Sequence, residues 1–326
     1  MVRRGLLVLT VTMLAVSLGF AVYFSQEAIQ ADKPQDRKPI HHHPEFHLVF
    51  ISQEMGSLYW KEVEKGARAA AADHDVVIEF EAPARPNIEE HVGLIERAVA
   101  SQVDGIITQG LTDQDFTPVI NKAVDRGIQV LTVDSDIKGS KRYAYVGTDN
   151  YRAGYLAGEK MAEAMGGEGD VGIVTSSEKV NNMKQRIEGF KDAVRQHSKI
   201  RIVAVEETHL LKKTSQKAGE IFNAHPDVKG FFGTSASDAS GLVEVADERG
   251  KIGEVVIMAF DDLPQTLRYL EEGKLEVVVV QQPYEMGYRS VTSMLALLKG
   301  KQPNRDMHTS VRLQTSDDLR KKEETP

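Results

Sequence analysis

The sequence predicts an α/β protein of two doubly wound, parallel-sheet lobes, preceded by one N-terminal transmembrane helix. Short β-branched runs alternate with helical stretches from Phe46 to the end of the chain, which is typical of parallel sheets covered on both faces. The runs are too many for one comfortable open sheet, and 326 residues are enough for two domains. One uncharged apolar segment, residues 5–24, stands apart at the N-terminus.

The apolar segment follows Arg3 and Arg4 and is long enough, as a helix, to cross the roughly 30 Å hydrocarbon core of a membrane. The positive-inside rule then places everything after Phe24 outside the cytoplasm. We expect residues 1–24 to be an uncleaved signal anchor; the alternative is a cleaved signal peptide, with a weak cleavage site at 28–31. Residues 25–45 are polar and proline-containing, as expected of a juxtamembrane linker.

Composition excludes several classes of protein. The net charge of −8 and the pI near 5.7 argue against nucleic-acid binding. The absence of cysteine excludes disulfides, a thiol nucleophile, thiolate metal sites and a lipid-modified N-terminal cysteine. The histidines at 41–43 and His47 are interpreted as a solvated tail rather than a metal site, because no carboxylate accompanies them. We therefore expect neither a metal nor a cofactor.

Nine runs are predicted to be strands, and they leave two architectures open. The helix after the second run is expected to be capped by Asn87, with Glu90 three residues on. A closed (β/α)₈ barrel and two doubly wound lobes both fit the alternation, but residues 143–150 follow a strand without an intervening helix and are interpreted as a crossover into a second lobe. The predicted strands are 48–51, 76–80, 105–108, 128–133, 171–174, 202–205, 230–233, 255–260 and 277–280.

Polar and aromatic residues gather where the predicted strands end, which is where open parallel sheets bind ligands. Carboxylates, an arginine fork, amides and aromatic faces together suit a carbohydrate. Each residue also has a structural alternative: Asp134 and Asp262 as helix N-caps, Trp60 as core, Arg186 on a solvated helix face and Gln281 as a loop amide. The set is residues 53–60, Asp134–Asp136, Arg186, Ser235, Asp261–Asp262 and Gln281–Gln282.

Sequence signatures of enzymes are missing. The chain has no Gly-x-Ser-x-Gly elbow, Walker loop or His-Glu-x-x-His motif, and the glycine-rich run 166–169 precedes a strand, so it is interpreted as a turn. We expect no catalytic residues and no chemistry on the ligand. A sugar-processing barrel enzyme is the alternative, because it too would place aspartates at strand ends.

Seven motifs of the chain are similar to those of a known family: residues 59–67, 103–107, 128–134, 185–190, 224–228, 259–262 and 278–283. Through these motifs the chain resembles the ribose/galactose-type periplasmic binding proteins, the sugar receptors of importers, whose ligand lobes recur in the lactose-repressor class of regulators. The resemblance runs from about Leu48 to about Leu313. A DNA-binding regulator is not expected, because residues 1–45 hold no helix-turn-helix.

The resemblance implies a set of ligand contacts. Asp134, Arg186, Asp261 and Gln281 keep the residue types usual in ribose binders. Tyr59 and Trp60 keep the aromatic pair. Serines at three positions and a histidine at a fourth depart from that pattern and indicate a polyol other than ribose. The full implied set is Gln53, Ser57, Tyr59, Trp60, Asp134, Ser135, Arg186, His209, Ser235, Asp261 and Gln281.

The resemblance also implies the domain organisation and the partners. Three hinge crossovers are expected, near 148–149, 281–282 and 310–311. Lobe one is then 46–148 plus 282–310, lobe two is 149–281 plus 311–320, and 321–326 is a disordered tail. The function implied is capture of a sugar or polyol by a monomer outside the cytoplasm for an ABC permease; the alternative partner is a histidine kinase. No nucleic-acid partner is expected.

Overall fold

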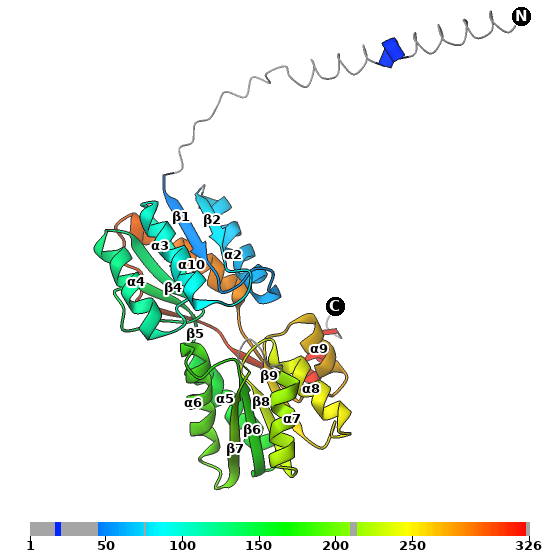
Figure 1. Cartoon of the computed structure of the whole chain (residues 1–326). Helices are drawn as coiled ribbons and strands as arrows, with labels where there is room; N and C mark the ends of the chain where they lie inside the picture. Colours follow the sequence, from blue (N-terminus) through cyan, green and yellow to red (C-terminus); the bar gives the residue numbers. More distant parts are fainter. Residues whose placement is uncertain (1–16, 21–44, 75, 209–213, 324–326) are drawn as a thin grey trace, which may run out of the picture. The chain divides into compact units, whose positions relative to one another are not determined.

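The computed structural model describes residues 17–20, 45–74, 76–208, 214–323 of the chain. In this part of the chain two six-stranded sheets form separate lobes, as Figure 1 shows, so the prediction of two doubly wound lobes is confirmed and the barrel is excluded. The sheet of lobe one has the order β11-β5-β4-β3-β1-β2, and that of lobe two has the order β12-β10-β9-β8-β6-β7.

Lobe one is a parallel sheet with a pair of helices on each face. Alternate residues of β1 point to opposite faces: Leu48 and Phe50 pack with α2 and α10, and Val49 and Ile51 pack with α3 and α4. Asn87 accepts a hydrogen bond from the Glu90 N–H, which confirms the predicted cap. The elements are β1 (His47–Ile51), α2 (Leu58–His74), β2 (Val77–Glu81), α3 (Ile88–Ala100), β3 (Gly105–Thr108), α4 (Asp113–Asp125), β4 (Gln129–Val133), β5 (Ala144–Thr148), α10 (Pro283–Leu298) and β11 (Asp306–Thr309).

Lobe two repeats this plan. Helices α5 and α6 cover one face of its sheet and α7 and α8 the other, and only the short edge strand β12 runs antiparallel to its neighbour β10. The elements are α5 (Asn150–Ala164), β6 (Glu168–Thr175), α6 (Asn181–Val194), β7 (Lys199–Glu207), α7 (Thr214–Ala224), β8 (Val228–Gly233), α8 (Asp238–Glu248), β9 (Val256–Phe260), α9 (Pro264–Glu271), β10 (Val277–Val280), β12 (Arg312–Gln314) and α11 (Ser316–Glu323).

The chain crosses between the lobes three times. Strand β5 of lobe one leads into α5 of lobe two, β10 of lobe two leads into α10 of lobe one, and β11 leads into β12. Residues 143–150 are thus a crossover, but 144–148 also form a strand that the sequence analysis did not assign. The expected tail was wrong at 321–323, because α11 extends to Glu323.

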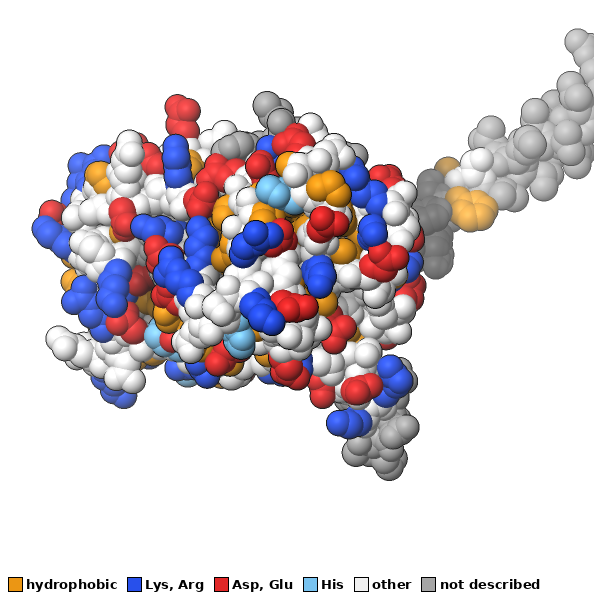
Figure 2. Space-filling model, turned by 90° about the horizontal axis from the view of Figure 1, so that it is seen from below, with side chains coloured by type: hydrophobic (Ala, Val, Ile, Leu, Met, Phe, Trp, Pro, Cys, Tyr) orange, Lys and Arg blue, Asp and Glu red, His pale blue; other side chains and the backbone are white. Residues whose placement is uncertain are grey.

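The predicted N-terminal helix lies outside the described residues except at 17–20, and so do the histidines at 41–43. In the segments that the structure does describe, there is no helix of the length and hydrophobicity that a membrane crossing requires. On the surface of the lobes, Figure 2 shows acidic and basic side chains intermingled across the face in view.

Glycines let the helices of lobe two approach each other closely, and this approach positions a residue of the cleft. A Cβ on Gly189 of α6 would lie 2.0 Å from the carbonyl oxygen of Tyr151 on α5, and a Cβ on Gly154 of α5 would lie 2.0 Å from that of Arg186. The α2–α10 pair of lobe one has the same kind of contact at Gly66. The backbone at Arg186 is therefore held against α5 with no room for a side chain between them.

We expect Gly189→Ala to lower the free energy of unfolding by about 3 kcal/mol, because the added methyl forces two packed helices apart. Gly93→Ala on α3 is the matched control: no atom lies within 4 Å of its added Cβ. That control is expected to be neutral or to stabilise the protein by up to about 1 kcal/mol, since alanine is the better helix former. Urea unfolding of both variants checks this, and equal effects would contradict it.

Candidate ligand-binding site

The two lobes place an aspartate at the same point of their folds. Asp134 follows β4 and Asp261 follows β9, and the two strands occupy equivalent places in the two sheets. Both residues adopt left-handed backbone conformations, with φ of 64° and 69°, which aspartate tolerates better than most residues. Neither Asp134 nor Asp262 caps a helix: the chain runs from β4 to β5 without one, and the N-cap of α9 is Leu263.

A cavity of about 240 Å³ lies between the lobes, and both aspartates line it. Nine of the eleven residues that the resemblance implied are among its lining residues: Gln53, Ser57, Tyr59, Trp60, Asp134, Arg186, Ser235, Asp261 and Gln281. Residues from β1–α2, β3 and β4 of lobe one face residues from α6, β8, β9 and β10 of lobe two. The remaining lining residues are Glu54, Pro86, Gln109, Ser176, Asn182, Met183, Ala236, Ser237 and Leu263.

Arg186 is the buried cation of this cavity, with only 2% of its surface exposed, so the solvated-helix alternative was wrong. Its guanidinium donates to Asn150 Oδ1 at 2.8 Å, to the Thr234 carbonyl oxygen at 2.7 Å and to Gln281 Oε1 at 3.0 Å. Its Cζ also lies 3.9 Å from the centroid of the Phe260 ring. These contacts fix the guanidinium in place before any ligand arrives.

Asp134 accepts hydrogen bonds from both lobes. Tyr59 Oη donates to it at 2.5 Å and Gln109 Nε2 at 2.5 Å, both within lobe one, and Asn182 Nδ2 donates from lobe two at 3.1 Å. Burial raises the pKa of its carboxyl, while the positive charge of Arg186 and the donated hydrogen bonds oppose that rise. The carboxyl is thus a hydrogen-bond acceptor shared between the lobes.

Asp261 accepts fewer side-chain hydrogen bonds than Asp134. Burial raises the pKa of its carboxyl to about 7, although Arg186 and a hydrogen bond from Gln281 Nε2 at 2.8 Å both act to lower it. Gln281 is itself buried and accepts from Thr148 Oγ1 at 2.6 Å through its Oε1 atom, so it is more than a loop amide. Asp261 is therefore poised to change protonation near neutral pH when a ligand donates to it.

Tyr59 and Trp60 belong both to the core of lobe one and to the wall of the cavity. Trp60 is 5% exposed, belongs to the core of lobe one and also lines the cavity. Its ring meets that of Tyr59 edge to face, with centroids 5.6 Å apart. The pair therefore supplies an apolar wall that the core holds rigid.

Two residues of the implied set are not among those lining the cavity. Ser135 is fully buried, and its Oγ has no hydrogen-bond partner among the described residues. Ser135 directly follows the left-handed residue Asp134, and its role as a ligand contact stays a prediction. His209 lies outside the described residues. Ser235 does line the cavity, where its hydroxyl donates to the buried Asp238 at 2.8 Å.

The sequence analysis missed four polar residues of the cavity: Gln109, Ser176, Asn182 and Ser237. Gln109 directly follows β3, so the strand-end rule could have found it; its Oε1 atom is buried and has no donor among the described residues. Asn182 lies on the first turn of α6 and is recognisable only once the two lobes are in place. A free amide oxygen beside Asp134 is suited to accept a hydroxyl proton.

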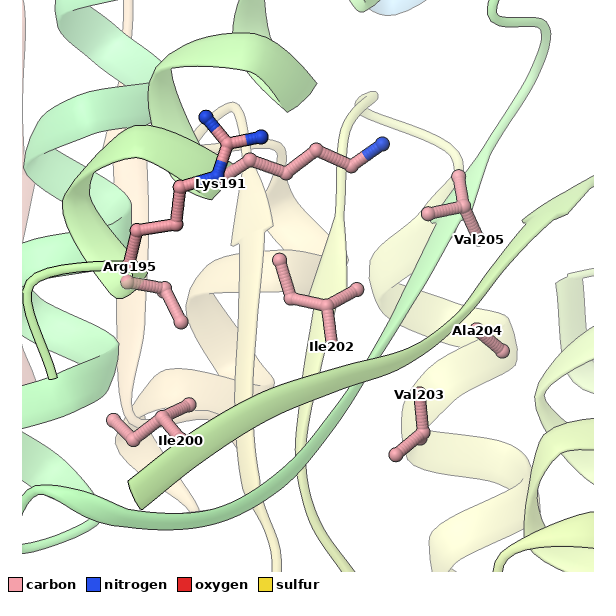
Figure 3. A pocket seen from close by; sticks show the side chains of 8 residues that line it. Lys191, Arg195, Ile200, Ile202, Val203, Ala204 and Val205 are labelled. Carbon is pink, nitrogen blue, oxygen red and sulfur yellow. The ribbon is translucent and has the colours of Figure 1, made fainter. Parts of the chain in front are cut away.

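A second hollow, of about 480 Å³, lies on lobe two between α6 and β7 (Figure 3). Its floor is aliphatic, from Ile200 to Val205, and Lys191 and Arg195 flank it. No carboxylate or amide side chain is among its lining residues, so it lacks the acceptors that a polyol needs. The interlobe cavity is the better candidate for a sugar.

Comparison with known proteins agrees with this geometry. The model of the family described as periplasmic binding protein domain matches residues 48–302. A D-ribose/D-allose-binding protein of Pseudomonas aeruginosa is 24% identical over 289 residues, which are 86% of this chain and 88% of that protein.

Two solved structures are more similar still. GanP, a glucose-galactose binding protein from Geobacillus stearothermophilus, is 45% identical with a TM-score of 0.82, and the match covers 84% of this chain and 98% of GanP. A chain of the XylFII–LytSN complex is 33% identical with a TM-score of 0.78, over 83% of this chain and 98% of that one. Since the family model spans β1 to the end of α10, the chain belongs to the periplasmic binding protein domain family.

Proposed function

We propose that this protein captures a single small sugar between its two lobes and releases it unchanged. The interlobe cavity carries the proposal. Its three carboxylates, its guanidinium and its amides match the hydroxyls of a polyol, and its aromatic pair matches the C–H face of a ring. Its volume of about 240 Å³ is below the roughly 300–1,000 Å³ of sites for drug-sized ligands, so it suits one ring.

Two of the relatives support an aldose as the ligand. GanP is a glucose-galactose binding protein, and another relative binds D-ribose and D-allose. We expect a hexose or pentose with a Kd of about 1 μM or lower. Gln53, Ser57, Tyr59, Trp60, Asp134, Gln109, Arg186, Ser235, Asp261 and Gln281 are the proposed contacts, and no residue is assigned a catalytic role.

Thermal-shift and calorimetric screening of the purified protein against a panel of pentoses and hexoses tests the proposal. A ligand present at a thousandfold excess over its Kd stabilises the folded state by about 4 kcal/mol, which gives a clear shift of the melting temperature. Amino acids and nucleosides at the same concentration are the controls. A shift with one of those and none with any sugar would contradict the proposal, and conversion of the sugar would contradict the binding-only role.

We further propose that residues 1–24 anchor the monomeric protein in the membrane, with the lobes outside the cytoplasm, beside the permease of a sugar ABC importer. A linker of about twenty residues reaches roughly 25 Å as a random coil, which keeps the lobes close to a membrane partner. The XylFII–LytSN complex favours a second candidate, in which the liganded lobes bind the outer domain of a histidine kinase. Deleting the gene separates the two: lost sugar uptake supports the importer, and lost sugar-induced transcription with intact uptake supports the sensor.

A further inference from the structure

Helix α6, which carries Arg186, has no N-terminal cap of its own. Its N-cap residue is Val180, which makes no capping hydrogen bond through its side chain. The side chains of Asn87, Thr112 and Asp149 cap α3, α4 and α5, whereas α8, α9 and α10 also lack a side-chain cap. The first four N–H groups of any helix have no acceptor in the helix backbone. In α6 the Met183 N–H donates to Asn182 Oδ1 of the helix itself, at 3.0 Å.

The first residue of α6, Asn181, finds its acceptors in lobe one, as does the side chain of Asn182. The backbone N–H of Asn181 donates to the carbonyl oxygen of Leu111 at 2.9 Å. The side-chain amide of Asn181 donates to the carbonyl oxygen of Asp136 at 2.9 Å, and that of Asn182 donates to Asp134 at 3.1 Å. Leu111 follows β3 and the two aspartates follow β4, so all three acceptors lie at the cavity edge of lobe one.

Packing and charge also favour contact between the N-terminus of α6 and lobe one. Val180 packs against the apolar core cluster of lobe one that contains Leu111 and Ile137. The N-terminus of a helix carries a partial positive charge, and the carboxylate of Asp113 also lies nearby, 3.4 Å from the side-chain amide of Asn181. Lobe one thus offers the α6 N-terminus acceptors, negative charge and an apolar contact at once.

We propose that the N-terminus of α6 is an interlobe latch: lobe one caps it when the cleft is closed, and opening the cleft leaves it uncapped. Asn181 is then a positioning residue for ligand binding. It is not among the residues that line the sugar cavity, but it lies five positions before Arg186 on the same helix. The bonds that seat Asn181 against lobe one therefore also present Arg186 to the cleft. The inference rests on the proposed function for its effect on affinity, but the latch itself exists without a ligand.

The test measures the distance between spin labels, one on each lobe, in the full chain without ligand. Asn181→Ala is expected to shift the distance distribution towards the open form, because two interlobe bonds weaken or are lost. Val180→Ser is expected to shift it further, since it removes the apolar contact and supplies the helix with a hydroxyl cap of its own. This second variant keeps α6 capped within lobe two, so its effect is not one of unfolding. Gln185→Ala, one turn further along α6, is the matched control and should match the wild type.

Affinity is the second readout. With the sugar that gives the largest thermal shift, Asn181→Ala is expected to bind about five- to tenfold more weakly, because the competent closed state is less populated. The ligand-saturated distance should equal that of the wild type, since the ligand contacts are intact. Unchanged ligand-free distances in both variants would overturn the latch. If no sugar binds, the proposed function fails, while the ligand-free distances still decide on the latch.

Discussion

Arg186→Ala is expected to weaken sugar binding by more than a hundredfold and to lower the free energy of unfolding by about 3–5 kcal/mol. Binding is lost because, among the described residues that line the cavity, the guanidinium is the only cation. Stability is lost because Asn150, Gln281 and the Thr234 carbonyl oxygen are left buried without this donor. Calorimetric titration and urea unfolding measure the two effects.

Two companion variants sharpen this prediction. Arg195→Ala, at the other end of α6, removes a solvent-exposed guanidinium that pairs with the partly exposed Asp192, and it should change neither affinity nor stability by more than about 0.5 kcal/mol. Arg186→Lys keeps the charge but not the planar fork, so it should recover stability only in part and affinity hardly at all. Wild-type affinity in Arg186→Ala would show that the cavity is not the binding site.

Sugar affinity is expected to rise with pH and to level off above about pH 7. The carboxyl of Asp261 has a pKa of about 7 in the ligand-free protein, because burial raises it. A sugar hydroxyl that donates to the carboxylate favours the ionised form, so binding below this pH releases a proton. The affinity should then rise by up to tenfold for each pH unit, or about thirtyfold between pH 5.5 and 7.5. Titrations in buffers of different ionisation enthalpy measure the released proton directly.

Asp261→Asn should abolish this pH dependence and weaken binding by about a hundredfold, while Asp262→Asn, the adjacent half-exposed carboxylate, should do neither. The stability of the ligand-free protein should change in the opposite direction. Because the pKa of Asp261 is higher in the folded than in the unfolded protein, this carboxyl lowers the free energy of unfolding as the pH rises from about 4 to 7. Affinity that falls with rising pH would mean that the neutral carboxyl is the binding form, and would contradict the prediction.

The sequence was sufficient for the strands that are continuous apolar runs and less so for β5, β11 and β12, whose sequences include polar residues. Continuous apolar runs such as 277–280 are recognisable alone, because both faces of the sheet are covered. Strands β5, β11 and β12 have five, four and three residues, and each is completed by pairing with a strand that is distant in the chain or belongs to a crossover. Local pattern carries no signal for such pairing.

The same limit applies to the cavity. Residues that end strands, such as Asp134 and Gln281, follow from the strand pattern and the resemblance. Ser135 also follows from the resemblance, but it is not among the lining residues, and the strand pattern does not indicate that it is fully buried beside Asp134. Asn182 was missed because its partner lies in the other lobe. The deep burial of Arg186 was also missed, because the side of α6 that carries it is buried only by the cleft between the lobes.

The three crossovers also govern the order in which the molecule can complete itself during synthesis. Arg142 of lobe one is fully buried, and it is held by Asp136 at 2.5 Å, by Asp306 at 2.6 Å and by the carbonyl oxygen of Arg305. Two of these three partners, Arg305 and Asp306, are synthesised more than 160 residues after Arg142. The same is true of β11, which pairs with β5. A nascent chain that ends before Arg305 therefore has a buried arginine short of partners and an unpaired sheet edge. Synthesis of lobe one begins before that of lobe two, but its last strand is made after most of lobe two. Most of lobe two can therefore fold before the sheet of lobe one is complete.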